Sequence, residues 1–322
     1  MTTKQQLLEL FEANREVYFS GEEIAVRLKL SRTAVWKAVS ALRGEGYEIF
    51  AASGRGYCLS AKNDIISEQG IKKYLKNPER EITVLARTSS TNAVARELAA
   101  AGAAEGSAVI AGEQDAGRGR MGRGFFSPPG TGIYLSLLLR PAGFSAQRTV
   151  KITTIAAVAM CEAIEAVSPE HAGIKWVNDI FVRGKKVCGI LTEASFGLED
   201  GAAEYAVLGA GVNVYVPEGG FPPELSEVAG AVLERRRDDI KNRLAAEFIN
   251  RFDEYYFRQD GKAYSEKYRQ RSLVTGRRVK VITPAGSEEA LALGIDEECR
   301  LLVKYDDGST RALSSGEISV RL

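Results

Sequence analysis

The sequence predicts an α+β protein of three domains: a winged helix-turn-helix at 1–62, a mixed α/β domain at 63–271 and an SH3-like β-barrel at 272–322. Three observations lead to this fold class. The chain has 322 residues, too many for one ordinary hydrophobic core. Its first part contains successive helix signals followed by a hairpin pattern. Its last part contains short apolar runs separated by glycine-containing turns, with Asp307-Gly308 marking a hairpin.

The composition is that of a globular protein without a large charge excess. The 43 basic and 42 acidic side chains leave a formal charge of +1, so any surface for nucleic acid must be local. No apolar run approaches the roughly 20 residues that cross a bilayer. The first residues include acidic side chains and no apolar core of the kind that a secretion signal needs. We therefore expect a cytoplasmic protein with no membrane partner.

Histidine and cysteine are rare, which excludes two classes of active site. His171 is the only histidine, so neither a Ser-His-Asp triad nor a histidine-rich metal centre is expected. The cysteines lie far apart without a CxxC pair, which is typical of reduced, buried thiols in the cytoplasm. The chemistry must therefore depend on lysine, arginine, carboxylates and backbone groups. The four cysteines are Cys58, Cys161, Cys188 and Cys299.

Three helix starts and a hairpin predict the first domain. Apolar residues recur at helical spacing from Leu7 to Phe11. Ser20 and Glu23 have the spacing of a capping box at the start of a second helix, and Ser31 can cap a third. An apolar hairpin follows and completes a winged helix. Its strands are expected at 47–50 and 57–59, with a turn at 51–56.

One face of the third helix is expected to contact DNA. Its apolar residues would point inward, which leaves polar and aromatic side chains for the major groove or its phosphates. The alternative is a helical protein-interaction module whose exposed face is only solvated. Because the chain has no basic excess, DNA binding would require a dimer at one specific site. The predicted DNA contacts are Arg32, Thr33, Trp36, Lys37 and Ser40 on the helix, with Arg55 at the tip of the wing.

A glycine-rich loop in the middle of the chain matches the dinucleotide fingerprint G-x-G-x-x-G. The match consists of Gly117, Gly119 and Gly122. A Rossmann site needs a helix to open directly after the glycines, so that its N-terminus meets the pyrophosphate. The segment RGFFSPPGTG follows instead, and its prolines forbid a helix. The loop is therefore not a Rossmann loop, and the chain contains no Walker motif either.

The arginines of this loop indicate an anionic ligand. Arg118, Arg120 and Arg123 alternate with glycines that let the backbone approach a ligand closely. Three guanidinium groups so close together repel one another, and their natural partner is a polyphosphate or a carboxylate. A solvated basic loop or an RNA contact is the alternative.

Five sequence blocks carry a family resemblance: SSTN (89–92), GRGRMGR (117–123), KWVND (175–179), KKVCGIL (185–191) and GAGVNV (209–214). In this order and spacing they resemble the biotin protein ligase family. With the winged helix in front, the whole chain is similar to the bifunctional branch, which combines a biotin ligase with a repressor of the biotin operon. The resemblance implies a central catalytic domain of the class II synthetase and biotin ligase type.

The resemblance also implies a biotin site and a set of catalytic residues. The family's essential lysine falls seven residues after the aspartate of the K-W-x-N-D block, which selects Lys186 and not Lys185. The implied catalytic residues are Lys186, Arg118, Arg120 and Asp179. The implied biotin-binding residues are Ser90, Thr91, Asn92, Gln114, Arg118, Gly119, Arg120 and Lys186.

For ATP and the adenylate, the resemblance implies a third set of residues, and two positions depart from the family pattern. Phe125 stands where family members often have tryptophan, so adenine stacking should persist but weaken. Val177 replaces the proline of K-W-P-N-D, which loosens the turn without removing its polar residues. The implied nucleotide-binding residues are Gly117, Arg120, Arg123, Phe125, Lys175, Asn178 and Asn213.

The implied reaction suits a chain without an activated nucleophile. Biotin's carboxylate attacks the α-phosphorus of ATP and yields biotinyl-5′-adenylate and pyrophosphate. Arg118, Arg120 and Lys186 would neutralise phosphate charge, together with Mg²⁺, whose ligands the sequence leaves unassigned. A lysine of a biotin carboxyl carrier protein, with a free pKa near ~10.4, then attacks the anhydride. Asp179 is the candidate acceptor of its proton; alternatively, Asp179 only hydrogen-bonds its own turn.

Two other functions stay open on the sequence alone. A transcription factor whose middle domain senses a small anion would use the winged helix and the arginine loop, but it gives Lys186 no role. A lipoate or octanoyl ligase of similar architecture would carry out the same chemistry on another acid. The remaining partners that the resemblance implies are operator DNA and a second copy of the chain, bound when the adenylate is present.

Overall fold

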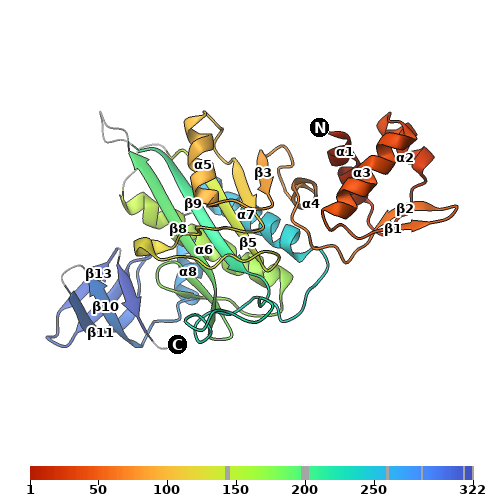
Figure 1. The fold of residues 1–322 in the computed structure, drawn as a ribbon. Coiled ribbons are helices and arrows are strands. Elements are labelled where there is room, and N and C mark those ends of the chain that lie inside the picture. The colour runs from red at the N-terminus through yellow and green to blue at the C-terminus, as the bar shows by residue number, and fades with distance from the viewer. Residues whose placement is uncertain (142–145, 197–202, 259–260, 284–285, 315, 321–322) are drawn as a thin grey trace. The chain divides into compact units, whose positions relative to one another are not determined.

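The chain forms two compact units in the computed structural model (Figure 1). The first unit consists of Met1–Pro78 and Arg235–Ala246, and the second of Glu79–Glu234 and Glu247–Leu322. The predicted domain boundaries at 62/63 and 271/272 stay predictions. No described helix is both long and apolar enough to cross a membrane. The structure describes all residues except 142–145, 197–202, 259–260, 284–285, 315 and 321–322.

The first unit contains the predicted winged helix-turn-helix. The capping box is present: Glu23 N donates to Ser20 Oγ at 3.1 Å, and Ser20 N donates to Glu23 Oε2 at 2.6 Å. Ser31 caps the third helix through Ala34 N at 3.1 Å. The first wing strand starts at Ile49, later than predicted. The elements are α1 (Thr3–Ala13), α2 (Gly21–Leu28), α3 (Arg32–Gly44), β1 (Ile49–Ala52), β2 (Gly56–Leu59) and α4 (Glu68–Lys72).

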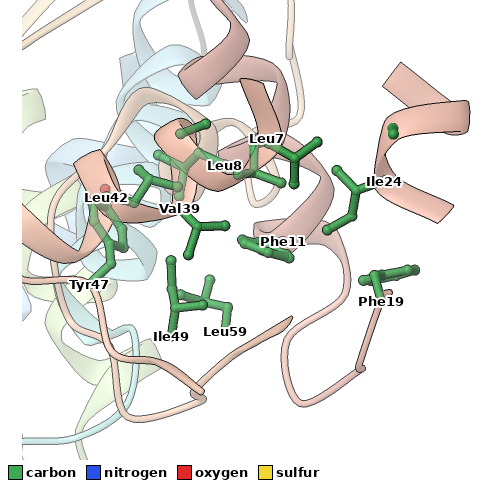
Figure 2. Close-up of a cluster of buried hydrophobic side chains, with 13 residues drawn as sticks. Leu7, Leu8, Phe11, Phe19, Ile24, Val39, Leu42, Tyr47, Ile49 and Leu59 are labelled. Carbon is green, nitrogen blue, oxygen red and sulfur yellow. The ribbon is translucent and has the colours of Figure 1, made fainter. Parts of the chain in front are cut away.

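An apolar core joins the helices of this unit to its wing. Figure 2 shows Phe11 of α1 and Val39 of α3 facing Leu59 of the wing. Phe11 and Leu59 are fully buried and Val39 is 1% exposed. Each large apolar side chain buried in this way contributes about 1.5–3 kcal/mol relative to exposure. The apolar residues that recur at helical spacing in the sequence therefore form the core against which α3 packs.

Buried ion pairs connect the winged helix to the short segment 235–246 of the same unit. Asp239 is 5% exposed and lies 2.7 Å from Arg15 and 2.5 Å from Lys73. Lys73 also lies 2.7 Å from Glu12 of α1, and Arg15 lies 2.8 Å from the same carboxylate. Each buried charge therefore has an opposite partner, which buried ions require.

The second unit is built on a seven-stranded mixed sheet. Its strand order is β3-β4-β5-β9-β8-β7-β6. β3 and β4 pair in parallel and the other neighbours pair antiparallel, so the sheet is largely antiparallel. The strands are β3 (Ile82–Leu85), β4 (Ala108–Ala111), β5 (Gly132–Leu139), β6 (Gly173–Lys175), β7 (Asp179–Val182), β8 (Lys185–Phe196) and β9 (Ala203–Asn213).

Two helices cover opposite faces of this sheet. Successive residues of a strand point to opposite faces. Thr192 of β8 hydrogen-bonds Thr153 of α6 at 2.8 Å, whereas the next residue, Glu193, accepts a hydrogen bond from Asn92 of α5 at 2.7 Å. α5 starts at Thr91, so Thr91 and Asn92 belong to its first turn. The helices are α5 (Thr91–Ala100), α6 (Ala146–Val167), α7 (Ile240–Arg258) and α8 (Gly261–Gln270).

Two consecutive helices lie between the central sheet and the C-terminal strands in the sequence. The amphipathic segment 240–258 forms α7. The polar stretch after it contains a further helix, α8, whose buried face includes Tyr264 and Tyr268. α8 is difficult to predict from the sequence because most of its other positions are polar or charged.

The C-terminal part is a five-stranded antiparallel sheet in the order β13-β12-β11-β10-β14. The predicted Asp307-Gly308 hairpin is confirmed: it joins β12 to β13, and Gly308 has a φ of 86°. The predicted SH3-like barrel is not confirmed, because the described strands form an open sheet with β13 and β14 at its ends. The strands are β10 (Arg278–Thr283), β11 (Gly286–Ile295), β12 (Leu301–Tyr305), β13 (Thr310–Leu313) and β14 (Glu317–Ser319).

Replacement of Ser20 by alanine should destabilise α2, because the Glu23 amide loses its acceptor. The expected cost is about 1 kcal/mol, which makes opening of the first turn about fivefold more frequent. Amide hydrogen exchange of α2 in the full chain measures this. Ser53→Ala, at an exposed position in the wing turn, is the control. Equal exchange in the Ser20 variant and the wild type would contradict the capping role.

Candidate active site

A cavity of about 880 Å³ opens on the α5 face of the central sheet. Its floor contains Gly189, Gly209 and Gly211, which stand on adjacent strands β8 and β9. A Cβ added at Gly209 would lie 2.3 Å from Asn92 Oδ1, and one at Gly211 would lie 2.5 Å from the Phe125 ring. Both distances are shorter than van der Waals contact. Asn92 and Phe125 can therefore pack against the floor only because Gly209 and Gly211 have no side chains.

Phe125 lies directly on this glycine floor. Its ring is half-buried and forms a T-shaped contact with Tyr134 of β5, with centroids 6.4 Å apart. The ring edge faces Gly211 and, at 3.3 Å from a built Cβ, Gly189. An aromatic surface and a floor of backbone thus line the same part of the cavity, a combination that suits a flat apolar ring of a ligand.

The glycine-rich loop closes on itself, and no α-helix opens after its glycines, as the sequence predicts. A single 3₁₀ turn, Arg120–Gly122, takes the place of an α-helix, with Met121 and Gly122 in the left-handed region. Gly119 N donates to Arg123 O at 2.7 Å, and Phe125 N donates to Gly117 O at 2.8 Å. The loop is therefore a tight hairpin-like excursion and not the opening of a dinucleotide-binding helix.

Arg120 connects the loop to other parts of the unit. Its guanidinium donates to Asn178 Oδ1 at 3.1 Å and to Gly316 O, just before β14, at 2.9 Å. Arg118 and Arg123 are exposed. Ile318 and Val320 also line the cavity, so the C-terminal sheet contributes to its wall.

Lys186 and Asp179 form an ion pair in the cavity wall. The Lys186 Nζ lies 2.7 Å from Asp179 Oδ1, and both residues line the cavity. The neighbouring Lys185 points elsewhere and donates to the Ser226 carbonyl at 3.3 Å. The alternation of side chains along β8 therefore separates the two lysines, and the one that enters the cavity is Lys186.

The Ser-Thr-Asn turn joins the cavity through a polar network at the start of α5. Thr91 N donates to Gln114 Oε1 at 2.8 Å, and Gln114 Nε2 donates to Ser127 Oγ at 3.1 Å. Asn92 Oδ1 accepts from the buried Ser136 of β5 at 2.6 Å. These bonds satisfy the polar groups that the fold buries here.

The cavity brings together almost the whole predicted substrate site. Every residue predicted to bind biotin or nucleotide lines it, except Gly117, the buried first residue of the loop. Asn213 is at its edge and donates to Gly230 O at 3.1 Å. Sequence reasoning missed the glycine floor and the apolar walls, which include Phe221, Leu225 and Ile318. It also missed Ser136, which hydrogen-bonds Asn92. Ser136 did leave a signal, as a single polar residue in the apolar run GIYLSLLL.

Models of protein families match the chain in three places. The "Biotin/lipoate A/B protein ligase family" matches residues 84–213, an "HTH domain" matches 3–58, and the "Biotin protein ligase C terminal domain" matches 274–321. The bifunctional ligase/repressor BirA of Bacillus spizizenii is 36% identical over 98% of each chain. The chain belongs to the biotin protein ligase family.

Other relatives agree with this family membership. The bifunctional ligase/repressor BirA of Escherichia coli K12 is 31% identical over 96% of this chain and 94% of its own. Among solved structures, the biotin protein ligase of Aquifex aeolicus in complex with biotin and ATP is 26% identical, with a TM-score of 0.63. The match covers 74% of this chain and 97% of that one.

The predicted DNA-binding face of this family member is exposed. Trp36 of α3 is 59% exposed, although it is a large aromatic residue. Arg32 forms an exposed ion pair with Glu22 of α2 at 3.1 Å. Arg55 of the wing stacks over the Tyr18 ring at 4.0 Å. The remaining predicted contacts, Thr33, Lys37 and Ser40, are also exposed.

The histidine and the cysteines, to which the sequence assigns no catalytic role, lie on the surface and in the interior respectively. All four cysteines are free and buried. Cys188 lines the cavity, but burial raises the pKa of its thiol well above the usual range. His171 is on the surface, 2.8 Å from Glu165. The described residues contain no group of three or more side chains suited to a metal ion.

Gly209→Ala should destabilise the protein more than Gly189→Ala. A Cβ at Gly209 would meet the buried Asn92 amide at 2.3 Å, whereas the closest atom to a Cβ at Gly189 is 3.3 Å away. Overpacking of the first kind costs about 1–3 kcal/mol. Urea denaturation of the two full-length variants measures the difference. Equal free energies of unfolding would show that the floor tolerates a side chain at Gly209.

Proposed function

We propose that this chain is an ATP-dependent biotin protein ligase that also represses transcription in response to biotin. It forms biotinyl-5′-adenylate and transfers biotin to a lysine of a biotin carboxyl carrier protein. One observation carries the ligase proposal: a single cavity gathers the Ser-Thr-Asn turn, the arginine loop and the Lys186–Asp179 pair. Membership of the biotin protein ligase family supports it.

The two ends of the cavity suit the two substrates. Biotin's flat ureido ring would lie on the glycine floor beside the polar network of Asn92 and Gln114. The nucleotide would extend toward Arg120 of the loop and toward Asn178 and Asn213. Phe125 stands between them and can contact either ring. This division places the carboxylate of biotin near the phosphates and close to Lys186.

Activation needs the reacting groups positioned and their charge neutralised. The carboxylate oxygen of biotin forms a bond to the α-phosphorus while the bond from that phosphorus to pyrophosphate breaks. Lys186 and Arg118 supply positive charge to the crowded phosphate oxygens. Asp179 holds Lys186 in place through its ion pair. Arg120 donates hydrogen bonds to Asn178 and Gly316. We expect the loop that contains Arg120 to close over the intermediate when the ligands bind.

The second step is attack of the acceptor lysine's neutral amine on the anhydride carbonyl, with AMP as the leaving group. The amine must first lose a proton, and Asp179 is the carboxylate of the cavity closest to Lys186. Its pairing with Lys186 favours a positioning role for Asp179. Its role as the proton acceptor stays a prediction.

Mg²⁺ fits this cavity as the counter-ion of ATP and not as a permanently held metal. Asp179 and Glu227 are the carboxylates among the cavity-lining residues. Mg²⁺ commonly binds through one or two carboxylates together with substrate phosphates and water. When bound, it would neutralise phosphate charge. We propose that Asp179 would hold the ion when ATP is bound.

For repression, we propose that α3 and the wing bind operator DNA as part of a homodimer that forms when the adenylate is bound. The exposed Trp36 and the polar face of α3 support DNA contact. Near-neutral charge supports a requirement for two half-sites. We further propose that the C-terminal sheet is of the SH3-like class, as its five short antiparallel strands support. Use of ATP and four free thiols supports a cytoplasmic location.

Lys186→Ala should abolish adenylate formation and leave the fold intact. The side chain supplies phosphate charge from a strand end and is one-third exposed, so the core does not depend on it. Biotin-dependent release of pyrophosphate from ATP measures the activity. Lys185→Ala, the adjacent lysine outside the cavity, is the matched control and should retain activity. Wild-type rates in the Lys186 variant would remove this residue from catalysis.

Lys37→Ala should weaken operator binding without slowing biotin transfer, because the winged helix and the cavity belong to different units. Loss of a phosphate contact should lower the salt dependence of binding by about one unit of log–log slope. Titrations of operator DNA at several salt concentrations measure both effects. Lys29→Ala, at the end of α2, is the control. Unchanged affinity in the Lys37 variant would show that the recognition face is assigned wrongly.

A further inference from the structure

Glu193 contacts the predicted biotin site from outside the cavity. It belongs to β8 and points to the α5 face of the sheet. One carboxylate oxygen accepts from Asn92 Nδ2 at 2.7 Å, and the other accepts from Arg96 at 3.1 Å. Glu193 does not belong to the residues that line the cavity, whereas Asn92 does. Any effect of Glu193 on a ligand must therefore act through Asn92.

The carboxylate fixes which way the Asn92 amide faces. An ionised carboxylate can only accept hydrogen bonds, so the amide must present its NH₂ group to Glu193. The amide oxygen then faces Ser136, whose hydroxyl lies 2.6 Å away. An amide without such a partner could turn over and exchange its donor and acceptor sides.

This choice passes along the network to neighbouring groups. The Ser136 hydroxyl donates to Asn92 Oδ1 at 2.6 Å and to Thr91 Oγ1 at 2.8 Å. The Thr91 hydroxyl in turn donates to Gln114 Oε1 at 3.1 Å. On the other side of Thr91, its backbone N–H fixes the oxygen of Gln114, which leaves the Gln114 NH₂ toward Ser127. Each donor and acceptor at this end of the cavity thus has a defined place.

We propose that Glu193 is a positioning residue for recognition of biotin's ureido ring, acting by holding the Asn92 amide in one orientation. The proposal rests on the proposed function, in which biotin binds beside the Ser-Thr-Asn turn. A cyclic urea presents a carbonyl acceptor next to N–H donors, so it requires a fixed pattern of partners. If the Asn92 amide turned over, donors would face donors and acceptors would face acceptors. This would lower the affinity for the ureido ring and for no other part of the substrates.

Initial rates of pyrophosphate release by the full chain test this, with biotin and ATP varied separately. Glu193→Met removes the acceptor and retains the volume of the side chain. We expect its KM for biotin to rise about tenfold, or ~1.4 kcal/mol, while KM for ATP and kcat stay as in the wild type. Glu193→Gln should restore most of the affinity, because its amide oxygen can accept from Asn92. Glu97→Gln, an exposed carboxylate of α5, is the control.

A double-mutant cycle separates this inference from the proposed site. Asn92→Ala should raise KM for biotin, and adding Glu193→Met should raise it no further, because Glu193 acts through Asn92. Additive effects, or a normal KM for biotin in Glu193→Met, would overturn the inference. A normal KM in Asn92→Ala would instead overturn the placement of biotin. If Glu193→Met does not fold, Ser136→Ala decides: it removes the donor to Asn92, and the same rise confined to biotin supports the inference while a normal KM overturns it.

Discussion

The candidate site depends on a steric constraint, the absence of side chains at Gly209 and Gly211 on one face of β9. A Cβ at either position would collide with Asn92 or with Phe125. The antiparallel register places Gly189 opposite Gly211, so the bare patch extends over two strands. Because α5 and the arginine loop approach the sheet from this side, the polar groups of both converge on one floor. The absence of side chains at these glycines therefore allows the cavity, the Phe125 ring and the Ser-Thr-Asn turn to meet on one floor.

The polar groups above this floor are held from several parts of the unit. Glu193 of β8 holds Asn92, and Ser136 of β5 completes its hydrogen bonding. Gly316, from the C-terminal sheet, holds Arg120. A ligand that fills the cavity thus meets groups whose orientation the fold has already set, which lowers the cost of ordering them. The C-terminal part thus contributes to this preorganisation, because its Gly316 carbonyl accepts a hydrogen bond from Arg120 of the loop.

The sequence predicted those features that local chemistry determines. Ser20 and Glu23 mark a helix start, and prolines after Gly122 exclude a Rossmann helix, whatever the rest of the chain does. Contacts between distant residues leave no such local mark. Asn92 and Glu193 are 101 residues apart, and no spacing rule connects them. The predicted site residues were reached through the family resemblance, and the barrel was inferred from strand spacing, which says nothing about how a sheet closes.

The chemistry of the cavity raises a last problem, which is how the protein avoids modifying itself. Biotinyl-adenylate is an anhydride that reacts with thiolates and amines, and the cavity contains one cysteine and two lysines. The Cys188 thiol is fully buried, and the raised pKa keeps it protonated and unreactive at neutral pH. Lys186 is held in an ion pair with Asp179 at 2.7 Å, and a lysine that keeps its proton in such a pair has no free lone pair with which to attack. The same ion pair that would hold the lysine for its proposed role at the phosphates therefore also restrains it from attacking the anhydride.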